Sequence, residues 1–394
     1  MHPPGADVIV VRHGELGVKS DQVRIKMERQ LQGHLNALLE DRDIPGTVRT
    51  ERNRLYIETE PEHVDRATEA ATEAFGVVSA SPAIRIEPEL DAIFDAMERT
   101  TEACYDGGSF AVAARRAGGD EIHDFDSRDL EQEGGATVGE TIDSMGHSPD
   151  VDLDNPDFTV FVEARPEKAF VFVAKHAGPG GLPLGSQRPL VALLSGGHDS
   201  PIAAWEAMRR GSPVMPVYVG LGAHGGVDHQ ARAAAAADRL AALAPEYDMS
   251  RRIAEAGDIV AKLVEKVGDT RMLSLRRAML AIAEGVASEY DAVGIVTGEA
   301  IGQKSSQTTA NIAVTDRATT LPVHRPLLTM DKTEIMERAR ELGTYEESSI
   351  PTGCNRVAPS YPETNADLAA VEAAEPADLL ERARALGVET AHEH

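Results

Sequence analysis

The sequence predicts two small α+β units followed by an α/β domain built on a doubly wound parallel sheet. In the first 175 residues, strand-like and helix-like segments follow each other without strict alternation, which favours α+β structure. Beyond residue 189, apolar strands and helices alternate, a pattern typical of a parallel sheet covered by helices on both faces. Residues 176–189 separate the two patterns with four glycines and three prolines. We therefore expect domains at residues 1–62, 63–175 and 176–394.

The first two units are predicted from local periodicity. Residues 7–11 (DVIVV) and the alternating residues 54–59 indicate strands, and residues 23–39 carry apolar side chains at helical spacing. The chain then continues with helices at 63–75 and 90–103, strands at 83–86, 110–114, 158–163 and 169–174, and an acidic, glycine-containing stretch before the last two strands.

The third domain is predicted from apolar runs that are each followed by a helical pattern. Strands are expected at 190–194, 214–219 and 292–297, with helices at 201–210 and 232–243. Since ligands of such sheets bind at the carboxyl ends of the strands, we expect the functional loops directly after these strands.

Composition limits the possible classes of protein. The 394 residues carry 39 Lys and Arg against 65 Asp and Glu, a net charge of −26, and only 8 of the basic residues are lysines. This acidic, arginine-biased surface suits a salt-rich cytoplasm and disfavours nucleic-acid binding through net charge, although a local basic patch stays possible. We expect no membrane span and no export signal, and the two cysteines exclude a disulfide framework.

The sharpest local signal is the loop Ser195-Gly196-Gly197-His198-Asp199-Ser200, between a buried strand and a helix. Two glycines allow close backbone approach, the two serines add hydroxyl donors, and the helix N-terminus supplies free N–H groups, so the loop suits phosphate or pyrophosphate. Bare phosphate would repel Asp199, which indicates a Mg²⁺ ion shared between this carboxylate and phosphate oxygens. An ordinary strand-to-helix turn is the alternative.

Two further motifs are weaker. Residues 220–225 formally match G-x-G-x-x-G, but they follow a later strand and lack a well-placed acidic ribose ligand. Arg12-His13-Gly14-Glu15 looks like a phosphohistidine motif, but the rest of the sequence does not support that family.

A set of ordered blocks resembles the tRNA 4-thiouridine synthetase family over residues 7 to about 360. The blocks are Gly14-Glu15 with Lys19 and Arg24, Ala113 to Arg116, Gly180 to Gly185, Ser195 to Ser200, Thr297 to Gln303, Ser305 to Thr308, Arg325 to Leu327, Asp331 to Ile335 and Gly343 to Glu346. The resemblance implies a ferredoxin-like domain, a THUMP RNA-binding domain and a PP-loop ATP-pyrophosphatase domain. It also implies that ATP adenylates O4 of uridine 8 in tRNA and that a persulfide sulfur then displaces AMP, leaving 4-thiouridine.

Site residues follow from the matching positions. The resemblance makes Asp199 catalytic and a metal ligand, and Cys354, in a Gly/Pro loop beside Arg356, the sulfur-handling nucleophile; Cys104 is expected in the core. Lys332 is a weaker candidate for a phosphate contact. The implied ATP contacts are Leu193, Leu194, Ser195, Gly196, Gly197, Ser200, Tyr218, Val219, Arg276, Gly298 and Gln307.

The implied partners are tRNA and a sulfur source. The candidates for the RNA-facing patch are Arg12, Lys19, Arg24, Arg115, Arg116 and Lys175, with scattered solvated charges as the alternative. Only 40 residues follow Cys354, too few for the rhodanese domain of some family members, so the donor is expected to be external, either a cysteine desulfurase persulfide or sulfide.

Other functions stay open at this stage. The chain could be a PP-loop synthetase acting on a small molecule or on a sulfur-carrier protein of thiamine thiazole synthesis. It could also be a THUMP protein that binds RNA without catalysis. The sequence leaves a homodimer open.

Overall fold

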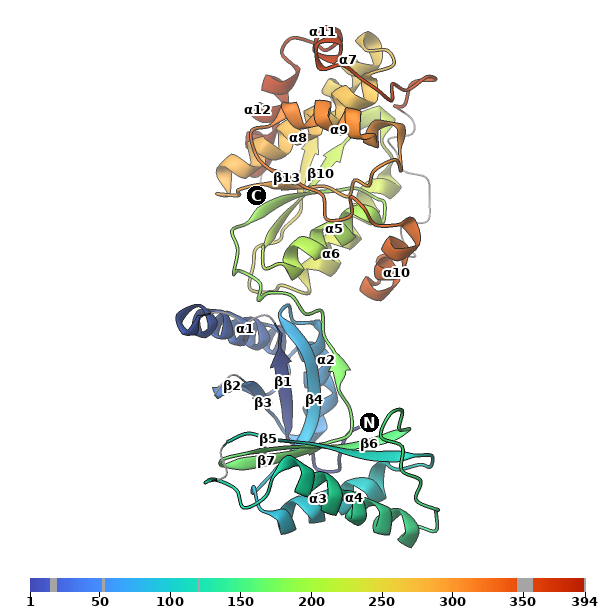
Figure 1. Cartoon of the computed structure of the whole chain (residues 1–394). Helices are drawn as coiled ribbons and strands as arrows, with labels where there is room; N and C mark the ends of the chain where they lie inside the picture. The colour runs from blue at the N-terminus through green and yellow to red at the C-terminus, as the bar shows by residue number, and fades with distance from the viewer. Residues whose placement is uncertain (15–19, 52–53, 119–120, 346–356, 393–394) are drawn as a thin grey trace. The chain divides into compact units, whose positions relative to one another are not determined.

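The computed structural model describes residues 1–14, 20–51, 54–118, 121–345 and 357–392. The chain divides into two compact units, Met1–Pro183 and Leu184–His394. Each unit is built around its own sheet (Figure 1).

The first unit contains one mixed sheet in the order β2-β3-β1-β4-β7-β6-β5, with the short β8 paired to β4. The long strand β4 joins two halves, because Ala80 and Ala83 pair with β1 while Ile84 and Ile86 pair with β7. The elements are β1 (Val8–His13), α1 (Asp21–Asp41), β2 (Thr47–Glu51), β3 (Arg54–Glu58), η2 (Pro61–His63), α2 (Val64–Glu73), β4 (Val77–Ile86), α3 (Leu90–Cys104), β5 (Phe110–Arg116), α4 (Ser127–Ser144), β6 (Phe158–Arg165), β7 (Lys168–Phe172) and β8 (His176–Ala177).

Side chains of β1 point alternately to the two faces of the sheet, and each face has its own hydrophobic core. Ile9 and Val11 pack with α1 and α2, whereas Val8 and Val10 pack on the opposite side against Phe172 of β7. Helix α2 and the first part of β4 belong to the first of these cores. The core that contains Ile9 and Val11 therefore includes residues beyond 62, the position at which the sequence analysis placed the end of the first domain.

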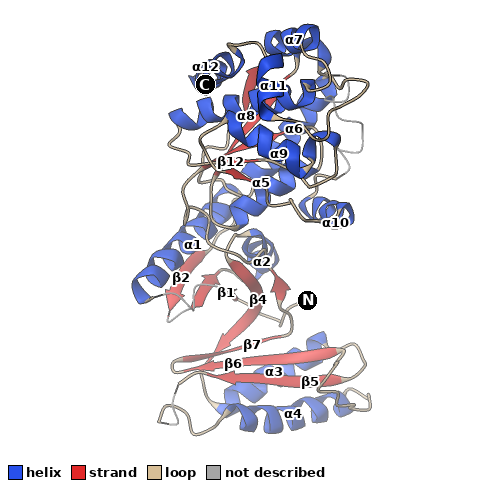
Figure 2. Ribbon diagram, turned by 45° about the horizontal axis from the view of Figure 1, so that its top comes forward, coloured by secondary structure: helices blue, strands red, loops and turns tan. Residues whose placement is uncertain are grey.

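Helices α3 and α4 lie side by side on one face of β5, β6 and β7 (Figures 1 and 2). The acidic, glycine-containing stretch holds α4, which the sequence analysis missed. Asp126 caps it by accepting from the N–H groups of Arg128 and Asp129. A Cβ at Gly134 would lie 2.6 Å from Cε of Met97, so this glycine lets α4 approach α3 closely.

The second unit contains a five-stranded sheet in the order β11-β10-β9-β12-β13, and all its strand pairs are parallel. Helices surround these strands (Figure 2), which confirms the predicted fold class. The elements are β9 (Leu190–Leu194), α5 (Asp199–Arg209), β10 (Val214–Gly220), η3 (Gly222–His224), α6 (Val227–Ala241), β11 (Arg252–Glu255), α7 (Gly257–Lys266), α8 (Arg271–Glu289), β12 (Ile295–Val296), η4 (Ser305–Gln307), α9 (Thr309–Thr315), η5 (Asp316–Ala318), β13 (Val323–His324), α10 (Lys332–Leu342), α11 (Leu368–Ala374) and α12 (Leu379–His392).

The strand order reverses at β9. The chain moves from β9 to β10 and β11 on one side and reaches β12 and β13 on the other. Such a switch point opens a crevice at the carboxyl ends of the two diverging strands. The loops after β9 and β12 therefore stand where a ligand of this fold binds.

Among the helices of the described ranges, none combines the length and apolar character that a membrane crossing requires.

Candidate active site

The loop between β9 and α5 is closed by its own serines. The Ser195 N–H donates to Oγ of Ser200 at 2.8 Å, the two hydroxyls lie 3.1 Å apart, and the Gly197 N–H donates to Oγ of Ser195 at 3.3 Å. Ser200 is buried, so it holds the loop together from inside. The structure thus brings Ser195 and Ser200 together, bonded to each other. That their hydroxyls donate to a phosphate stays a prediction.

Two close backbone approaches fix the position of this loop. A Cβ at Gly196 would lie 2.9 Å from the carbonyl oxygen of His229 in α6, and a Cβ at Gly298 would lie 2.7 Å from the Ser200 nitrogen. Real Cβ atoms essentially never come so close to backbone, so only glycine fits at either position. The N-terminal turn of α6 and the turn after β12 therefore both press against the loop.

Asp199 begins helix α5, where the helix dipole favours a negative charge. Its Oδ1 lies 3.3 Å from Nε2 of His198 without hydrogen-bond geometry, and its side chain is partly exposed. Within the described ranges, no group of three or more His, Cys, Asp or Glu side chains could hold a metal ion. One carboxylate beside the predicted phosphate loop nevertheless fits Mg²⁺, which proteins commonly hold with one or two carboxylates plus substrate phosphates.

A buried carboxylate stands next to Gly298. Glu299 is 5% exposed; its Oε1 accepts from Arg276 Nη1, and its Oε2 accepts from Arg325 Nε at 2.8 Å and from the Thr297 hydroxyl at 3.1 Å. Burial alone would raise the pKa of Glu299, but the charges of the two arginines and these hydrogen bonds lower it below the usual value. Glu299 is therefore ionised at neutral pH.

The other predicted nucleotide contacts surround the same strand ends. Leu194 and Tyr218 are register neighbours on β9 and β10, and Leu193 is half-buried beside them. Val219 continues β10 and is buried. Gln307 ends η4 and is 5% exposed, and no described residue donates a hydrogen bond to its Oε1. A buried amide oxygen without a partner suits a ligand contact.

Of the predicted RNA-facing residues, Arg12 and Lys175 lie close to one another in the structure. Arg12 donates to Oε1 of the buried Glu163 through Nε (2.9 Å) and Nη2 (2.6 Å) and lies 4.8 Å from the Phe172 ring centre. The Lys175 ammonium lies 3.9 Å from the ring centre of Phe161. These cations therefore meet on one aromatic face of the sheet.

Two arginines that the sequence analysis missed complete this group. Arg54 and Arg165 lie 3.8 and 3.4 Å from Oε2 of Glu163. We call Arg12, Arg54, Arg165 and Lys175 around Glu163 the cationic cluster. Burial alone would raise the pKa of Glu163, but its arginine neighbours lower it.

Of the remaining candidates, Arg115 on β5 is the register partner of Glu163 on β6, so it lies beside the cationic cluster. Arg24 pairs with Asp21 (2.8 Å) and Glu28 (3.9 Å) on α1. Arg115 is exposed at the end of β5, beside Arg116. Lys19 and Cys354 lie outside the described residues, whereas Cys104 is buried in the core, and this burial raises the pKa of its thiol.

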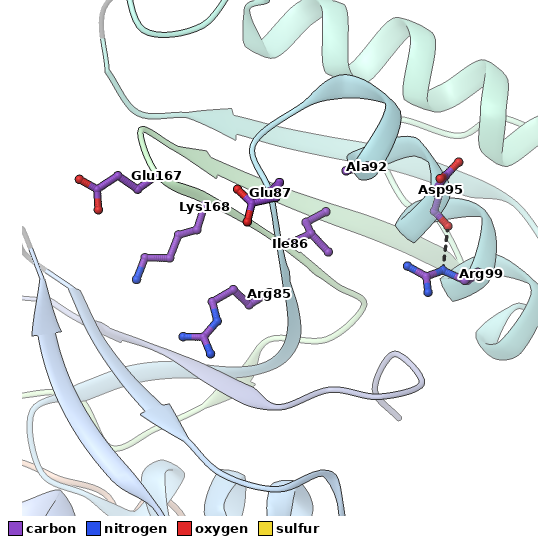
Figure 3. Close-up of a pocket in the computed structure, with 8 residues that line it drawn as sticks. All are labelled: Arg85, Ile86, Glu87, Ala92, Asp95, Arg99, Glu167 and Lys168. Atoms are coloured by element: carbon purple, nitrogen blue, oxygen red, sulfur yellow. Dashed lines mark hydrogen bonds between the residues drawn. The ribbon is translucent and has the colours of Figure 1, made fainter.

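The first unit also has a cavity of about 600 Å³, which Figure 3 shows beside β4, α3 and the β6–β7 turn. Its three cations already have partners: Arg85 pairs with Glu58, the Lys168 ammonium lies 2.6 Å from Glu51, and Arg99 Nε donates to the Asp95 carbonyl at 3.2 Å. No predicted site residue lines it, so the cavity adds nothing to the chemistry above.

The chain combines an α+β unit with an α/β domain whose parallel sheet carries a glycine loop at its switch point. Three family models match in order: the ThiI ferredoxin-like domain over residues 8–81, the THUMP domain over 87–174 and Thiamine biosynthesis protein (ThiI) over 185–379. A "Probable tRNA sulfurtransferase" of Halobacterium salinarum is 55% identical over 390 residues, covering 99% of this chain and 98% of the relative. The chain belongs to the tRNA sulfurtransferase (ThiI) family.

More distant proteins agree with this assignment. A "Probable tRNA sulfurtransferase" of Methanosarcina acetivorans is 37% identical and covers 92% of this chain and 87% of its own length. The solved structure of a 4-thiouridine synthetase–RNA complex with bound ATP matches with a TM-score of 0.83 at 28% identity, covering 98% of both chains. The predicted family and enzyme class are confirmed. The relative from Halobacterium also fits the halophilic composition.

Proposed function

We propose that this protein uses ATP to activate O4 of uridine 8 in tRNA and then replaces that oxygen with sulfur, forming 4-thiouridine. The observation that carries the proposal is the Ser195–Ser200 loop, held at the switch point by the close approaches of Gly196 and Gly298. A structure similar over 98% of the chain is that of a 4-thiouridine synthetase with RNA and ATP.

The first step is an attack of the uridine oxygen on the α-phosphorus of ATP. The bond between the α-phosphorus and its bridging oxygen breaks, pyrophosphate leaves, and the base loses its N3 proton as AMP becomes attached to O4. The glycine loop and the N-terminus of α5 bind the leaving pyrophosphate through backbone N–H groups. Asp199 would hold Mg²⁺, which supplies charge neutralisation on the phosphates when bound.

The second step transfers sulfur from Cys354, a role that rests on the family resemblance. The terminal sulfur of a Cys354 persulfide attacks C4, and AMP leaves with O4. The sulfur–sulfur bond must then break, which consumes an external thiol as reductant. The sulfur itself comes from an external donor. A cysteine desulfurase persulfide can transfer its outer sulfur to the Cys354 thiolate and leave as a thiol. Sulfide cannot form a persulfide without an oxidant, so sulfide as the donor would instead attack C4 directly and displace AMP. We propose that this chemistry takes place in the cytoplasm. A homodimer stays a separate proposal.

The tRNA is proposed to contact the first unit at the cationic cluster and at the exposed Arg115. One carboxylate faces four cations there, so the cluster keeps an excess of positive charge in a strongly acidic chain. The rings of Phe161 and Phe172, stacked at 5.1 Å, support the cations from behind. Arg24, Arg116 and Lys19 stay proposed secondary contacts.

The test is nucleoside mass spectrometry of tRNA from a strain that lacks this gene. Complementation with the wild-type gene is expected to restore 4-thiouridine, whereas Cys354→Ser and Asp199→Asn are expected to fail. Cys104→Ser is the matched control, because this second cysteine is buried and donates only to the His2 carbonyl. Full restoration by Cys354→Ser would remove this cysteine from the mechanism.

The alternatives are separated in vitro. A PP-loop enzyme acting on a small molecule or a sulfur-carrier protein would release pyrophosphate from ATP without tRNA. A THUMP protein that only binds RNA would release none. The proposal requires release that depends on tRNA.

A further inference from the structure

Glu299 connects four separate segments around the candidate nucleotide site. Through Arg276 it contacts helix α8, through Arg325 the end of β13, and through Thr297 the turn after β12. Arg276 in turn donates from Nε to the buried Ser306 hydroxyl at 2.9 Å, which adds η4 and places Gln307 next in the chain. The residue before Glu299 is Gly298, which touches the start of α5.

The two arginines have different surroundings. Arg325 is buried and is also held by Asp316, whose two oxygens accept from Nη2 at 2.5 Å and Nη1 at 3.3 Å. Its charge is therefore matched even without Glu299. Arg325 thus serves as an anchor that keeps the Glu299 carboxylate in place.

Arg276 is held at two of its three guanidinium nitrogens. Ser306 fixes Nε and Glu299 fixes Nη1, whereas no described residue accepts a hydrogen bond from Nη2. The side chain is 23% exposed, so it is not sealed from solvent. A planar fork fixed at two nitrogens presents the third in a defined direction, which suits recognition of a phosphate oxygen.

We propose that Glu299 is a positioning residue for ATP: anchored by Arg325, it holds Arg276 so that Nη2 of the guanidinium meets a phosphate of the nucleotide. This inference rests on the proposed ATP site and assigns a role to Glu299 and Arg325 within it. Glu299 itself touches no substrate. Its effect passes through Arg276.

The test measures equilibrium binding of ATP and the separate effects on KM and kcat in Glu299→Gln. Glutamine keeps the shape and the hydrogen bond with Thr297 but removes the charge, so we expect ATP binding to weaken about tenfold and KM to rise with it. We expect kcat to change much less, since the lost interaction orients a binding group.

Glu284→Gln is the matched control. Glu284 also bonds an arginine and a threonine in this unit, accepting from Arg384 Nε at 2.5 Å and from the hydroxyl and N–H of Thr320 at 2.7 Å. Its pKa is likewise lowered: burial opposes the shift, and the bonds from Thr320 and Arg384 produce it. We expect Glu284→Gln to lower thermal stability without changing the ATP affinity of the folded protein.

A double-mutant cycle shows whether the effect passes through Arg276. In an Arg276→Gln background, Glu299→Gln is expected to add no further loss of ATP affinity. Independent, additive losses would contradict the inference, and so would unchanged ATP affinity in Glu299→Gln or equal losses in the Glu284→Gln control.

Ser306→Ala provides a second variant in case Glu299→Gln does not fold. It removes the bond to Arg276 Nε without leaving a buried charge, and we expect ATP binding about threefold weaker. Unchanged affinity in folded Ser306→Ala would overturn the proposal. A wild-type protein that fails to bind ATP would instead refute the proposed function, so the two failures are distinguishable.

Discussion

The contact between Gly298 and the start of α5 gives a quantitative prediction for Gly298→Ala. The added Cβ would lie 2.7 Å from the Asp199 carbonyl carbon and the Ser200 nitrogen and 2.8 Å from the Ser200 Cα. Carbon contacts are optimal at about 3.5–4.0 Å, so the turn and the helix must separate by roughly 0.8 Å. All three atoms are backbone, and no side-chain rotation relieves the contact.

Overpacking of this kind costs about 1–3 kcal/mol of folding free energy. A displacement of about 1 Å in a catalytic site can lower the rate about 100-fold, so we expect this order of loss in tRNA-dependent pyrophosphate release. Gly268→Ala is the matched control, because a Cβ there meets nothing within 4 Å and its backbone is not left-handed. If Gly298→Ala released pyrophosphate at the wild-type rate with an unchanged melting temperature, the close approach would not position the loop.

Three further changes test other contacts. Gly196→Ala places a Cβ 2.9 Å from the His229 oxygen, so calorimetry is expected to show weaker ATP binding in a folded protein. Glu163→Gln leaves Arg12 without its carboxylate, and we expect urea unfolding to show a loss of about 3 kcal/mol. Because the folded-state pKa of Glu163 is lowered, this stabilisation is fully present above about pH 4.5 and is lost as the pH falls through the lowered pKa. The free energies of unfolding of the wild type and of Glu163→Gln are therefore expected to converge in acid. Arg277→Met removes the partner of the buried Glu375 (2.9 Å), and we expect a similar loss by thermal unfolding.

Much of the second unit could be predicted because its signals are local. The strand at 190–194 and the loop that follows depend on an apolar run, two glycines and a helix start, all within a dozen residues. The strand expected at 292–297 was too long, since only Ile295 and Val296 pair as β12. A strand's length depends on its neighbours, which sequence periodicity does not contain.

Contacts between distant segments could not be predicted in this way. Arg12 meets Glu163 across 151 positions of the chain, and nothing near either residue indicates the other. Arg54 and Arg165 were missed for the same reason. The block Thr297 to Gln303 was recognised, but only the structure shows that Glu299 joins it to Arg276 and Arg325.

The cationic cluster and the contacts around Glu299 are built in the same way, and this arrangement suits the acidic composition of the chain. In both, a buried glutamate fixes an arginine, Glu163 with Arg12 and Glu299 with Arg276. Salt at 1 M shortens the Debye length to about 3 Å, so exposed charges lose most of their attraction for a phosphate. A fixed, partly buried guanidinium is screened less and loses less side-chain freedom on binding. An acidic protein can therefore bind anionic ligands through a few oriented arginines while its net charge stays at −26.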